Sequence, residues 1–349
     1  MKLLKKSMSF GMAMLLTLSL AACGGQPETP SSETKDPTVE TNQGGTTSDS
    51  VETPATVRVA ALKGPTGMGL AYLEETSANE NNVSPYELTL AAAADEITPS
   101  LIQGELDMAC VPANLAAVLY QKTKGEIVNL GINTLGVLYI VELGDSVQSM
   151  EDLKGQTIVA AGKGSTPEYA LRYLLEQNGI DPEQDVTIDW KSEHSECVSA
   201  LASGAATIAL LPQPFVTVAG NKLTDLRIAL DLTQEWDALE NDSALLTGVV
   251  VARKAFVEEH SAVVEQFLTD YATSVEQVND NPAEAAVVIG EMGIVDAAVA
   301  EKAIPYCNIV CITGEEMKDK LSGYLEVLLE ANPQSVGGQL PGDDFYFGA

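Results

Sequence analysis

The stretch Asp152–Trp190, DLKGQTIVAAGKGSTPEYALRYLLEQNGIDPEQDVTIDW, predicts a βαβ unit. Its apolar run Thr157–Ala161 is typical of a buried strand, and Val186–Trp190 alternates as a second strand. A turn of small residues leads from the first strand into a helix, because Pro167 suits the first helical position and an Asn-Gly pair suits the end. The helix start should offer backbone N–H donors beside the side chains of Lys163–Thr166. Such a turn favours a polar or anionic ligand.

A similar turn occurs one hundred residues earlier in the chain. Val59–Thr66 reads VAALKGPT, and Val159–Thr166 reads VAAGKGST. The same offset pairs Leu101–Pro112, LIQGELDMACVP, with Leu201–Pro212, LASGAATIALLP. Alanine-rich chains produce chance matches, but two separate segments that match at one offset indicate two similar α/β lobes.

Strands and helices alternate along the rest of the folded part, which predicts parallel α/β sheets. Strands are expected at residues 57–62, 86–92, 108–111, 127–133 and 138–142, and helices at 68–73, 99–103 and 113–121. After Leu232 an apolar strand at 244–252 precedes helices expected at 254–279, 282–292, 295–303 and 314–331. A helical tail of this kind should pack on the first lobe. The chain would then cross between the lobes twice, near 138–143 and near 233–246.

The N-terminus has the pattern of a secretory signal. Three lysines precede an uncharged apolar run, Ser7–Ala22, that is too short for a spanning helix. The run ends in Leu-Ala-Ala before Cys23, which resembles the bacterial lipobox, where cleavage leaves a lipidated cysteine at the new N-terminus. An ordinary signal followed by a chance cysteine is the alternative, and the position of Cys23 favours the lipoprotein. Residues 26–55 are rich in Thr, Ser, Glu, Pro and Gly and predict a disordered tether.

The charge balance excludes several classes of partner. The chain has 19 basic and 50 acidic residues, a formal net charge of −31. Removing residues 1–22 removes three lysines and no acid, which leaves 16 against 50, or −34. Nucleic-acid binding requires a basic patch, and attraction to a lipid surface requires a polybasic segment. We therefore expect no nucleic-acid partner and contact with the membrane only through the N-terminal lipid. An anion would have to be bound locally, by helix N-termini and a few lysines.

The cysteines and histidines predict neither a metal site nor a cofactor. Cys110 and Cys197 lie in apolar or helical contexts that indicate buried small residues. Cys307 and Cys311 are either unpaired or joined locally by a disulfide, as an exported protein allows. Two thiols four residues apart and two histidines elsewhere give no cluster of metal ligands.

The candidate ligand-binding residues follow from the predicted sheets. Ligands of open parallel sheets bind beyond the carboxyl ends of the strands. Four loops that follow such ends, two in each lobe, should therefore line one cleft: Lys63–Thr66, Pro112–Asn114, Lys163–Thr166 and Pro212–Phe215. The candidates on and beside these loops are Lys63, Gly64, Thr66, Gly67, Asn114, Gly164, Ser165, Thr166, Glu193, His194, Gln213 and Phe215.

Each candidate also has a structural interpretation. The turn lysines either carry charge into the cleft or are solvated, and the turn hydroxyls either donate to ligand or cap helices. The side-chain amides of Asn114 and Gln213, which follow strand-ending prolines, either contact ligand or stabilise the turn. Phe215 forms an apolar wall or helix core, and Glu193 and His194 contact ligand, bridge the lobes or are simply exposed. Trp236 either packs in the core or stacks on a planar ligand. Tyr139 lies in the predicted hinge.

Several motifs, taken in their order along the chain, resemble the substrate-binding lipoproteins of bacterial ABC importers. They are the lipobox, KGPTG at 63–67, DLKG at 152–155, GKGSTP at 162–167, LLPQPF at 210–215 and NPQSVGGQLP at 332–341. The resemblance covers residues 56–349. More narrowly, the chain is similar to the branch that includes nitrate, sulfonate, taurine and thiamine-pyrimidine-precursor binders.

The resemblance implies the type II periplasmic-binding fold, with two α/β lobes, a two-strand hinge and closure over a ligand. The expected organisation is a signal peptide at 1–22, a lipidated Cys23 and tether at 23–55, lobe 1 at 56–140 plus 244–349, and lobe 2 at 141–243. It also implies a monomer, anchored outside the cytoplasm to the cell membrane by lipid (palmitate) on Cys23. This monomer would deliver ligand to a permease driven by an ATPase.

The expected ligand is a small polar organic solute: a sulfonate, another oxyanion or a pyrimidine-like heterocycle. A ligand-sensing receptor domain is the alternative function, since the fold is shared. An enzyme is a further alternative, because pyrimidine-synthase relatives of this branch use a lysine-bound cofactor, histidine and an iron-binding cysteine cluster. This chain has no cysteine-rich run, and neither a Ser-His-Asp triad nor a carboxylate pair is visible. No catalytic residue is therefore predicted.

Overall fold

The computed structural model describes residues 56–75, 84–241 and 243–349. The expected signal peptide, lipobox and tether fall on residues 1–55 and lie outside the described residues. Within the described ranges, no helix combines the length and the apolar character that a bilayer crossing requires. Residues Ser50–Ala349 form one compact unit, and both lobes of the fold lie within it.

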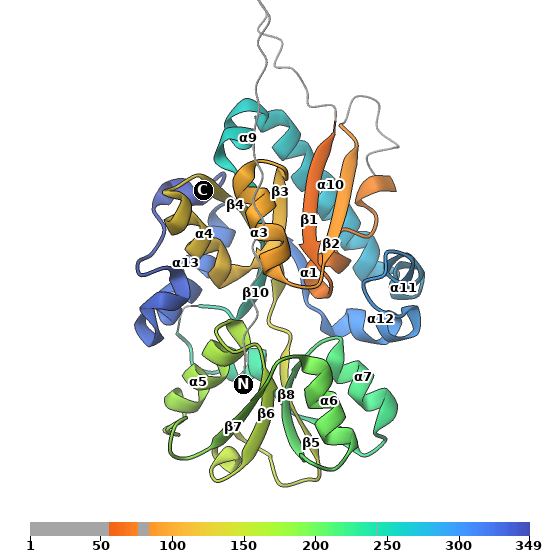
Figure 1. Ribbon diagram of the computed structural model, residues 1–349, viewed down its shortest axis with the longest axis vertical. Helices are drawn as coiled ribbons and strands as arrows, with labels where there is room; N and C mark the ends of the chain where they lie inside the picture. The colour runs from red at the N-terminus through yellow and green to blue at the C-terminus, as the bar shows by residue number, and fades with distance from the viewer. Residues whose placement is uncertain (1–55, 76–83, 242) are drawn as a thin grey trace, which may run out of the picture. The chain divides into compact units, whose positions relative to one another are not determined.

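Two β-sheets organise the described chain (Figure 1). The first has the strand order β11-β4-β10-β3-β1-β2, and the second has the order β7-β6-β8-β5-β9. The strands of the first sheet are β1 Val57–Leu62, β2 Tyr86–Ala91, β3 Met108–Pro112, β4 Ile127–Leu135, β10 Leu246–Arg253 and β11 Ile309–Ile312. Those of the second sheet are β5 Leu138–Leu143, β6 Thr157–Ala161, β7 Thr187–Lys191, β8 Ile208–Pro212 and β9 Leu226–Asp231.

Helices flank both sheets (Figure 1). In the first lobe they are α1 Pro65–Met68, α3 Ala94–Gln103, α4 Ala113–Thr123, α9 Lys254–Glu259, α10 Ser261–Asp280, α11 Pro282–Glu291, α12 Ala297–Ala303 and α13 Gly314–Ala331. In the second lobe they are α5 Thr166–Gln177, α6 His194–Ala202, α7 Phe215–Lys222 and α8 Leu232–Asp237. Short 3-10 turns lie at Met150–Leu153, Ile304–Tyr306, Pro333–Val336 and Asp343–Phe345.

The two lobes are built alike, as the repeat at an offset of 100 residues predicts. Each sheet contains a parallel trio, β2-β1-β3 in one and β7-β6-β8 in the other. The helices between the outer strands also correspond, because α3 begins at Ala94 and α6 at His194. Both starts are stabilised by a glutamate at the third position, since Glu96 accepts from the backbone N–H of Ala93 and Glu196 from that of Glu193. The prediction of two similar α/β lobes is confirmed.

The sheets are mixed rather than purely parallel, which corrects the prediction. β10 runs antiparallel to β3 and β4, and β5 runs antiparallel to β8 and β9. Both strands arrive from the other lobe, so each enters its sheet from the side opposite to the βαβ strands. This direction of entry makes them antiparallel, and the apolar pattern alone does not reveal it.

Three local predictions are also wrong. The helix expected over 254–279 is divided at His260, whose backbone (φ −134°, ψ 42°) is not helical. The helix expected over 68–73 is mostly turn, because α1 ends at Met68. β11 was not expected at all, since it has only four residues and lies at the sheet edge, mostly half-buried.

Helices cover both faces of each sheet, so the inner strands are mostly apolar, with a few buried polar residues such as Asn129, Asn133 and Glu142. In β1, Val57, Val59 and Ala61 point into one core cluster, and Ala60 points into another. The second of these clusters is continuous between the lobes, because it also contains Ile140 and other residues of the second sheet. The lobes are thus joined by packing as well as by the chain.

Trp236 lies in this shared core. Its side chain is fully buried, its ring centroid lies 4.7 Å from that of Tyr173 and 5.7 Å from that of Tyr324, and its indole N–H donates to Ser243 Oγ at 2.9 Å. Of the two roles considered for Trp236, the structure shows packing in the core.

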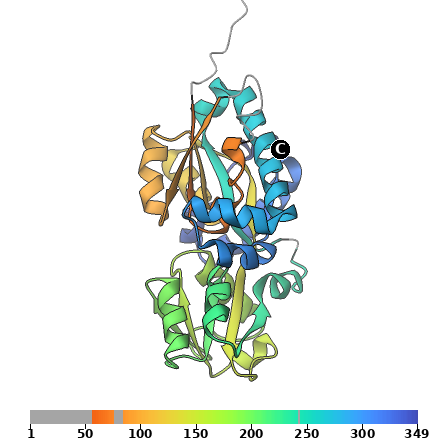
Figure 2. The same ribbon diagram turned by 90° about the vertical axis from the view of Figure 1, so that its right-hand side faces the viewer.

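The chain crosses between the sheets twice, from β4 to β5 and from α8 to β10. Two side-chain hydrogen bonds also join the lobes: Tyr139 OH donates to the carbonyl of Tyr306 at 3.2 Å, and Lys302 Nζ donates to Asn221 Oδ1 at 2.8 Å. The second bond joins α12 to α7, which lie next to each other in both views (Figures 1 and 2). The predicted lobe boundary at 140/141 falls inside β5, all of which pairs within the second sheet, and the boundary at 243/244 precedes β10.

Candidate functional site

A cavity of about 220 Å³ lies where strand ends of both lobes converge. This is the edge at which open α/β sheets bind ligands. Its lining residues are Leu62, Lys63, Gly64, Pro65, Thr66, Pro112, Val137, Leu138, Ser165, Thr166, Pro167, His194, Pro212, Gln213, Pro214, Phe215 and Thr247. They include eight of the twelve candidates expected from the sequence.

Two glycines shape the first-lobe turn that lines the cavity, one through its backbone conformation and one through the space it leaves. Gly64 has φ 133°, a left-handed value that favours glycine, and turns β1 into α1. A Cβ on Gly248 of β10 would lie 2.4 Å from Thr66 Cγ2, so β10 can pass beneath the turn only without one. The Thr66 hydroxyl donates back to the carbonyl of Leu62 at 3.2 Å. Lys63, by contrast, is exposed and is one of the lining residues of the cavity.

The second-lobe turn is tied down by its own helix. Ser165 Oγ donates to the carbonyl of Gly162 at 2.7 Å, and the Gly164 N–H donates to Glu168 Oε2 at 2.7 Å. Glu168 therefore already accepts from the backbone N–H of Gly164, one of the donors that the sequence analysis expects to bind an anion. Thr166 Oγ1 accepts from Tyr324 OH of α13 at 3.3 Å, a contact between the lobes.

Gln213 and Phe215 form the part of the lining that follows β8. Gln213 is 2% exposed, and its Oε1 accepts from the hydroxyl of Thr217 at 2.9 Å, which leaves the amide NH₂ as a donor. The ring of Phe215 packs against the imidazole of His194 with 5.2 Å between centroids. This side of the cavity is consequently apolar, with an amide donor at its edge.

Two solvent-shielded polar atoms of the lining have no protein partner among the described residues: His194 Nδ1 and Thr247 Oγ1. Burial lowers the pKa of His194 to about 4, so the imidazole is neutral at pH 7. Sequence reasoning reached His194 but missed Thr247. The only signal for Thr247 was its place directly before Gly248 on the strand that returns from the other lobe.

Four candidates lie outside the cavity lining. Gly67 packs on β1, where a Cβ would lie 2.7 Å from the carbonyl oxygen of Leu62. Asn114 is buried and donates to the carbonyl of Ser335 at 3.3 Å. Gly164 and Glu193 are exposed, and Glu193 accepts from Ser195 Oγ at 3.1 Å. None of these four residues lines the cavity, and the bonds of Asn114 and Glu193 go to other parts of the protein.

The second turn lysine also lies elsewhere. Lys163 is exposed and lines a separate surface hollow together with Arg172 and Trp190. Of the two turn lysines, only Lys63 therefore lies at the inter-lobe cavity.

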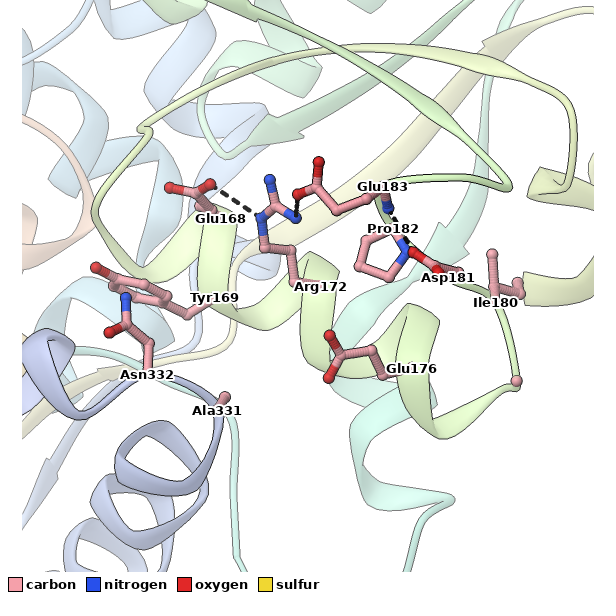
Figure 3. Close-up of a pocket in the computed structure, with 11 residues that line it drawn as sticks. Glu168, Tyr169, Arg172, Glu176, Ile180, Asp181, Pro182, Glu183, Ala331 and Asn332 are labelled. Atoms are coloured by element: carbon pink, nitrogen blue, oxygen red, sulfur yellow. Dashed lines mark hydrogen bonds and ion pairs between the residues drawn. The ribbon is translucent and has the colours of Figure 1, made fainter.

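A larger hollow, of about 700 Å³, lies between α5, the loop after it and the end of α13 (Figure 3). Its one arginine is already paired, because Arg172 Nε lies 2.9 Å from Glu168 Oε1 and Arg172 Nη1 lies 2.5 Å from Glu183 Oε1. Glu176 and Asp181 add further negative charge. This hollow is larger than the inter-lobe cavity, but its described lining contains no strand residue. We therefore take the smaller inter-lobe cavity as the candidate site.

The described lining of the inter-lobe cavity is mostly apolar and has one charged side chain. Among its described lining residues none is acidic, and Lys63 carries the only formal charge at pH 7. Over the described chain no three His, Cys, Asp or Glu residues gather into a possible metal site. The four cysteines of the described chain are unpaired, and burial raises the pKa of Cys307 to about 12, so its thiol is protonated. The disulfide considered for Cys307 and Cys311 is absent.

Comparison with known proteins identifies the family. Residues 70–302 match the model of the phosphonate-type periplasmic substrate-binding proteins of ABC transporters. No protein of curated function matches the sequence.

Solved structures share the fold. An ABC transporter protein from Parabacteroides distasonis is 24% identical, with a TM-score of 0.71, over 84% of this chain and 99% of that chain. The periplasmic aliphatic sulphonate-binding protein of Escherichia coli is 17% identical, with a TM-score of 0.68, over 84% and 96% of the two chains. The alkanesulfonate-binding protein of Xanthomonas axonopodis bound to MOPS is 15% identical, with a TM-score of 0.61, over 83% and 96%.

These likenesses confirm the two-lobed fold predicted from the sequence, and the family match covers more than half of the chain. Members of this family capture small molecules outside the cytoplasm for an ABC importer. The chain belongs to the phosphonate-type periplasmic substrate-binding protein family of ABC transporters.

Proposed function

We propose that this protein captures a small organic oxyanion, such as a sulfonate or phosphonate with a short apolar body, by closure of its two lobes. One observation carries the proposal: in a chain of net charge −31, the inter-lobe cavity has no acidic residue in its described lining and has Lys63 as one of its lining residues. Carboxylates near the cavity would repel an anion, whereas Lys63 attracts one.

The lining suits a ligand with one polar end. Donors come from Lys63, the hydroxyl of Thr166 and the amide of Gln213, and together they can supply charge-assisted hydrogen bonds. Prolines and the side chains of Leu62, Val137, Leu138 and Phe215 provide an apolar wall. A cavity of about 220 Å³ holds a solute smaller than most drug-sized ligands.

A planar pyrimidine-like heterocycle is the second candidate. It is favoured by the aromatic face of Phe215 beside the neutral imidazole of His194. The two classes differ in charge, so they differ in how much they depend on Lys63.

Calorimetric titration with ethanesulfonate, ethylphosphonate, nitrate and thymine tests the proposal, after native mass spectrometry of the purified protein for a ligand that co-purifies. We expect one of the oxyanions to bind, and Lys63→Ala to weaken it by about tenfold through loss of a charge-assisted bond. Lys163→Ala is the matched control, since it removes the same charge from the equivalent turn away from the cavity. Equal affinity of the parent and Lys63→Ala would refute the anion class, and binding of thymine alone would favour the heterocycle.

We further propose that the mature protein is a lipoprotein anchored through Cys23 and that it delivers its ligand to permease and ATPase subunits. The L-A-A-C sequence at the end of the apolar run supports the anchor. The Cys23→Ser variant should lose incorporation of labelled palmitate and leave the membrane fraction. Uptake of the labelled ligand should fall with it, whereas a sensory domain would alter signalling without altering uptake.

A further inference from the structure

Thr247 stands apart from the other hydroxyls of the cavity. Thr66 and Ser165 already donate to backbone carbonyls, and Thr166 accepts from Tyr324. Thr247 Oγ1 is shielded from solvent and has no partner within the described part of the chain. A buried hydroxyl without a partner costs stability, about 1–3 kcal/mol by mutational data, so such a group calls for an explanation.

The second unpartnered atom of the lining comes from the other lobe. His194 Nδ1 lies at the start of α6, whereas Thr247 lies on β10 of the first sheet. Both residues line the same cavity. The ring of His194 packs against Phe215, and Thr247 lies on β10, which pairs with β3 and β4. The two atoms thus come from opposite lobes, and neither has a protein partner among the described residues.

We propose that Thr247 is a specificity-determining residue that acts together with His194. The two side chains, one from each lobe, would hydrogen-bond to the same polar group of the ligand. This inference rests on the proposed function and deepens it. Both groups are uncharged and can donate, the threonine through its O–H and the imidazole through Nδ1–H, so a group with two acceptor oxygens fits them best. A sulfonate or phosphonate oxygen pair has this character. A ligand that satisfies both atoms joins the lobes.

The experiment compares the parent with Thr247→Val, Thr247→Ser and His194→Ala, titrated with the oxyanions of the same panel. Valine has the shape of threonine without the hydroxyl, so we expect Thr247→Val to bind about tenfold more weakly. Thr247→Ser restores the hydroxyl and should recover most of the affinity. The double variant Thr247→Val, His194→Ala should lose less binding free energy than the sum of the two single losses, because each single substitution already breaks the paired hydrogen bonds to the ligand.

Two residues of this chain serve as matched controls. Thr233 also carries a buried hydroxyl without a partner among the described residues, but it is not part of the cavity lining. His260 has an unpartnered Nδ1 and packs on Phe256 with 5.1 Å between centroids, yet it too lies outside the lining. Thr233→Val and His260→Ala should therefore leave affinity unchanged.

The outcomes separate the two proposals. If the parent binds an oxyanion and Thr247→Val binds it equally well, the pairing is wrong and the proposed function stands. If Thr247→Val unfolds at a lower temperature without ligand and serine does not restore affinity, the residue is structural and the pairing is wrong. If the parent binds none of the oxyanions, the proposed function is wrong, and this inference falls with it.

Discussion

Gly248 determines how closely β10 can pass the turn at 63–66. A Cβ at this position would lie 2.4 Å from Thr66 Cγ2 and 2.5 Å from Asn133 Oδ1. Gly248→Ala should therefore destabilise the protein by about 1–3 kcal/mol, the usual cost of overpacking, and displace Thr66 from the cavity. Urea denaturation measures the loss. Gly220 of α7 is the control, because nothing lies within 4 Å of its Cβ position and alanine there should stabilise the helix.

The burial of His194 predicts a dependence of stability on pH. Burial lowers its pKa to about 4, below the value of about 6.5 in an unfolded chain. Above pH 6.5 the imidazole is neutral in both states and has no effect. As the pH falls from 6.5 to 4 only the unfolded state takes up the proton, so stability is lost, by about 2 kcal/mol at pH 4.5. His194→Asn should lose less stability than the parent between pH 7.5 and 4.5 in thermal unfolding, and equal losses would contradict the burial of this side chain.

The sequence predicts which residues lie at strand ends but not which way their side chains point. Lys63, Thr66 and Gln213 line the cavity because each follows a strand that ends there. Asn114 has the same position in the pattern, yet it bonds to Ser335, more than two hundred residues away. Thr247 enters the cavity only because a strand from the other crossing packs beside the turn. Such contacts depend on tertiary packing, which periodicity does not contain.

The βαβ elements could be predicted because their apolar runs and turn residues are local signals, and the repeat at an offset of 100 residues reinforced them. β10 was expected as a strand at 244–252, but its direction and its neighbours were not. Which strands pair depends on tertiary structure when the partners lie more than a hundred residues apart in the sequence. The short edge strand β11, which pairs with the distant β4, therefore has no local signal that predicts it.

Asp107 ties β1 to β10. It is 3% exposed, and its Oδ1 lies 2.7 Å from Arg58 Nη2 and 2.8 Å from Arg253 Nη2. Burial raises the pKa of Asp107, but hydrogen bonds from both arginines outweigh that effect and hold the pKa below its ordinary value. The contribution of Asp107 to the free energy of unfolding is therefore fully present above the pKa of the unfolded chain. It is lost as the pH falls through the lowered pKa of the folded protein.

Asp107→Asn should cost about 2 kcal/mol at pH 7, because it removes charge-assisted bonds from a buried group. The cost should shrink in acid, where the parent carboxylate is itself protonated. Urea denaturation at several pH values measures both effects. Asp189→Asn is the control, since Asp189 pairs with Lys191 on the surface and should matter by less than about 1 kcal/mol. An equal effect of the two substitutions would show that burial of Asp107 is irrelevant.

At the scale of the whole molecule, the function proposed above couples ligand binding to closure of the lobes. The lobes share one hydrophobic core cluster, and they are also joined by side-chain hydrogen bonds. A ligand shifts such an equilibrium only by its differential affinity for the closed arrangement. By the same reasoning, a bond between the lobes outside the cavity influences affinity only where it is made in the closed arrangement and lost in the open one, which we expect for the hydroxyl of Tyr139.

Tyr139 tests this coupling. Its side chain is 4% exposed and does not belong to the cavity lining, and its hydroxyl donates to the carbonyl of Tyr306 in the other lobe. Tyr139→Phe removes that bond, worth about 1 kcal/mol, so the closed population and the apparent affinity should fall by up to about fivefold. Tyr86→Phe is the control, because the Tyr86 hydroxyl bonds to Asp270 within one lobe at 2.7 Å. It should lower stability but leave affinity unchanged. If Tyr139→Phe binds the ligand as tightly as the parent, this bond between the lobes does not bias closure, and affinity is determined by the cavity alone.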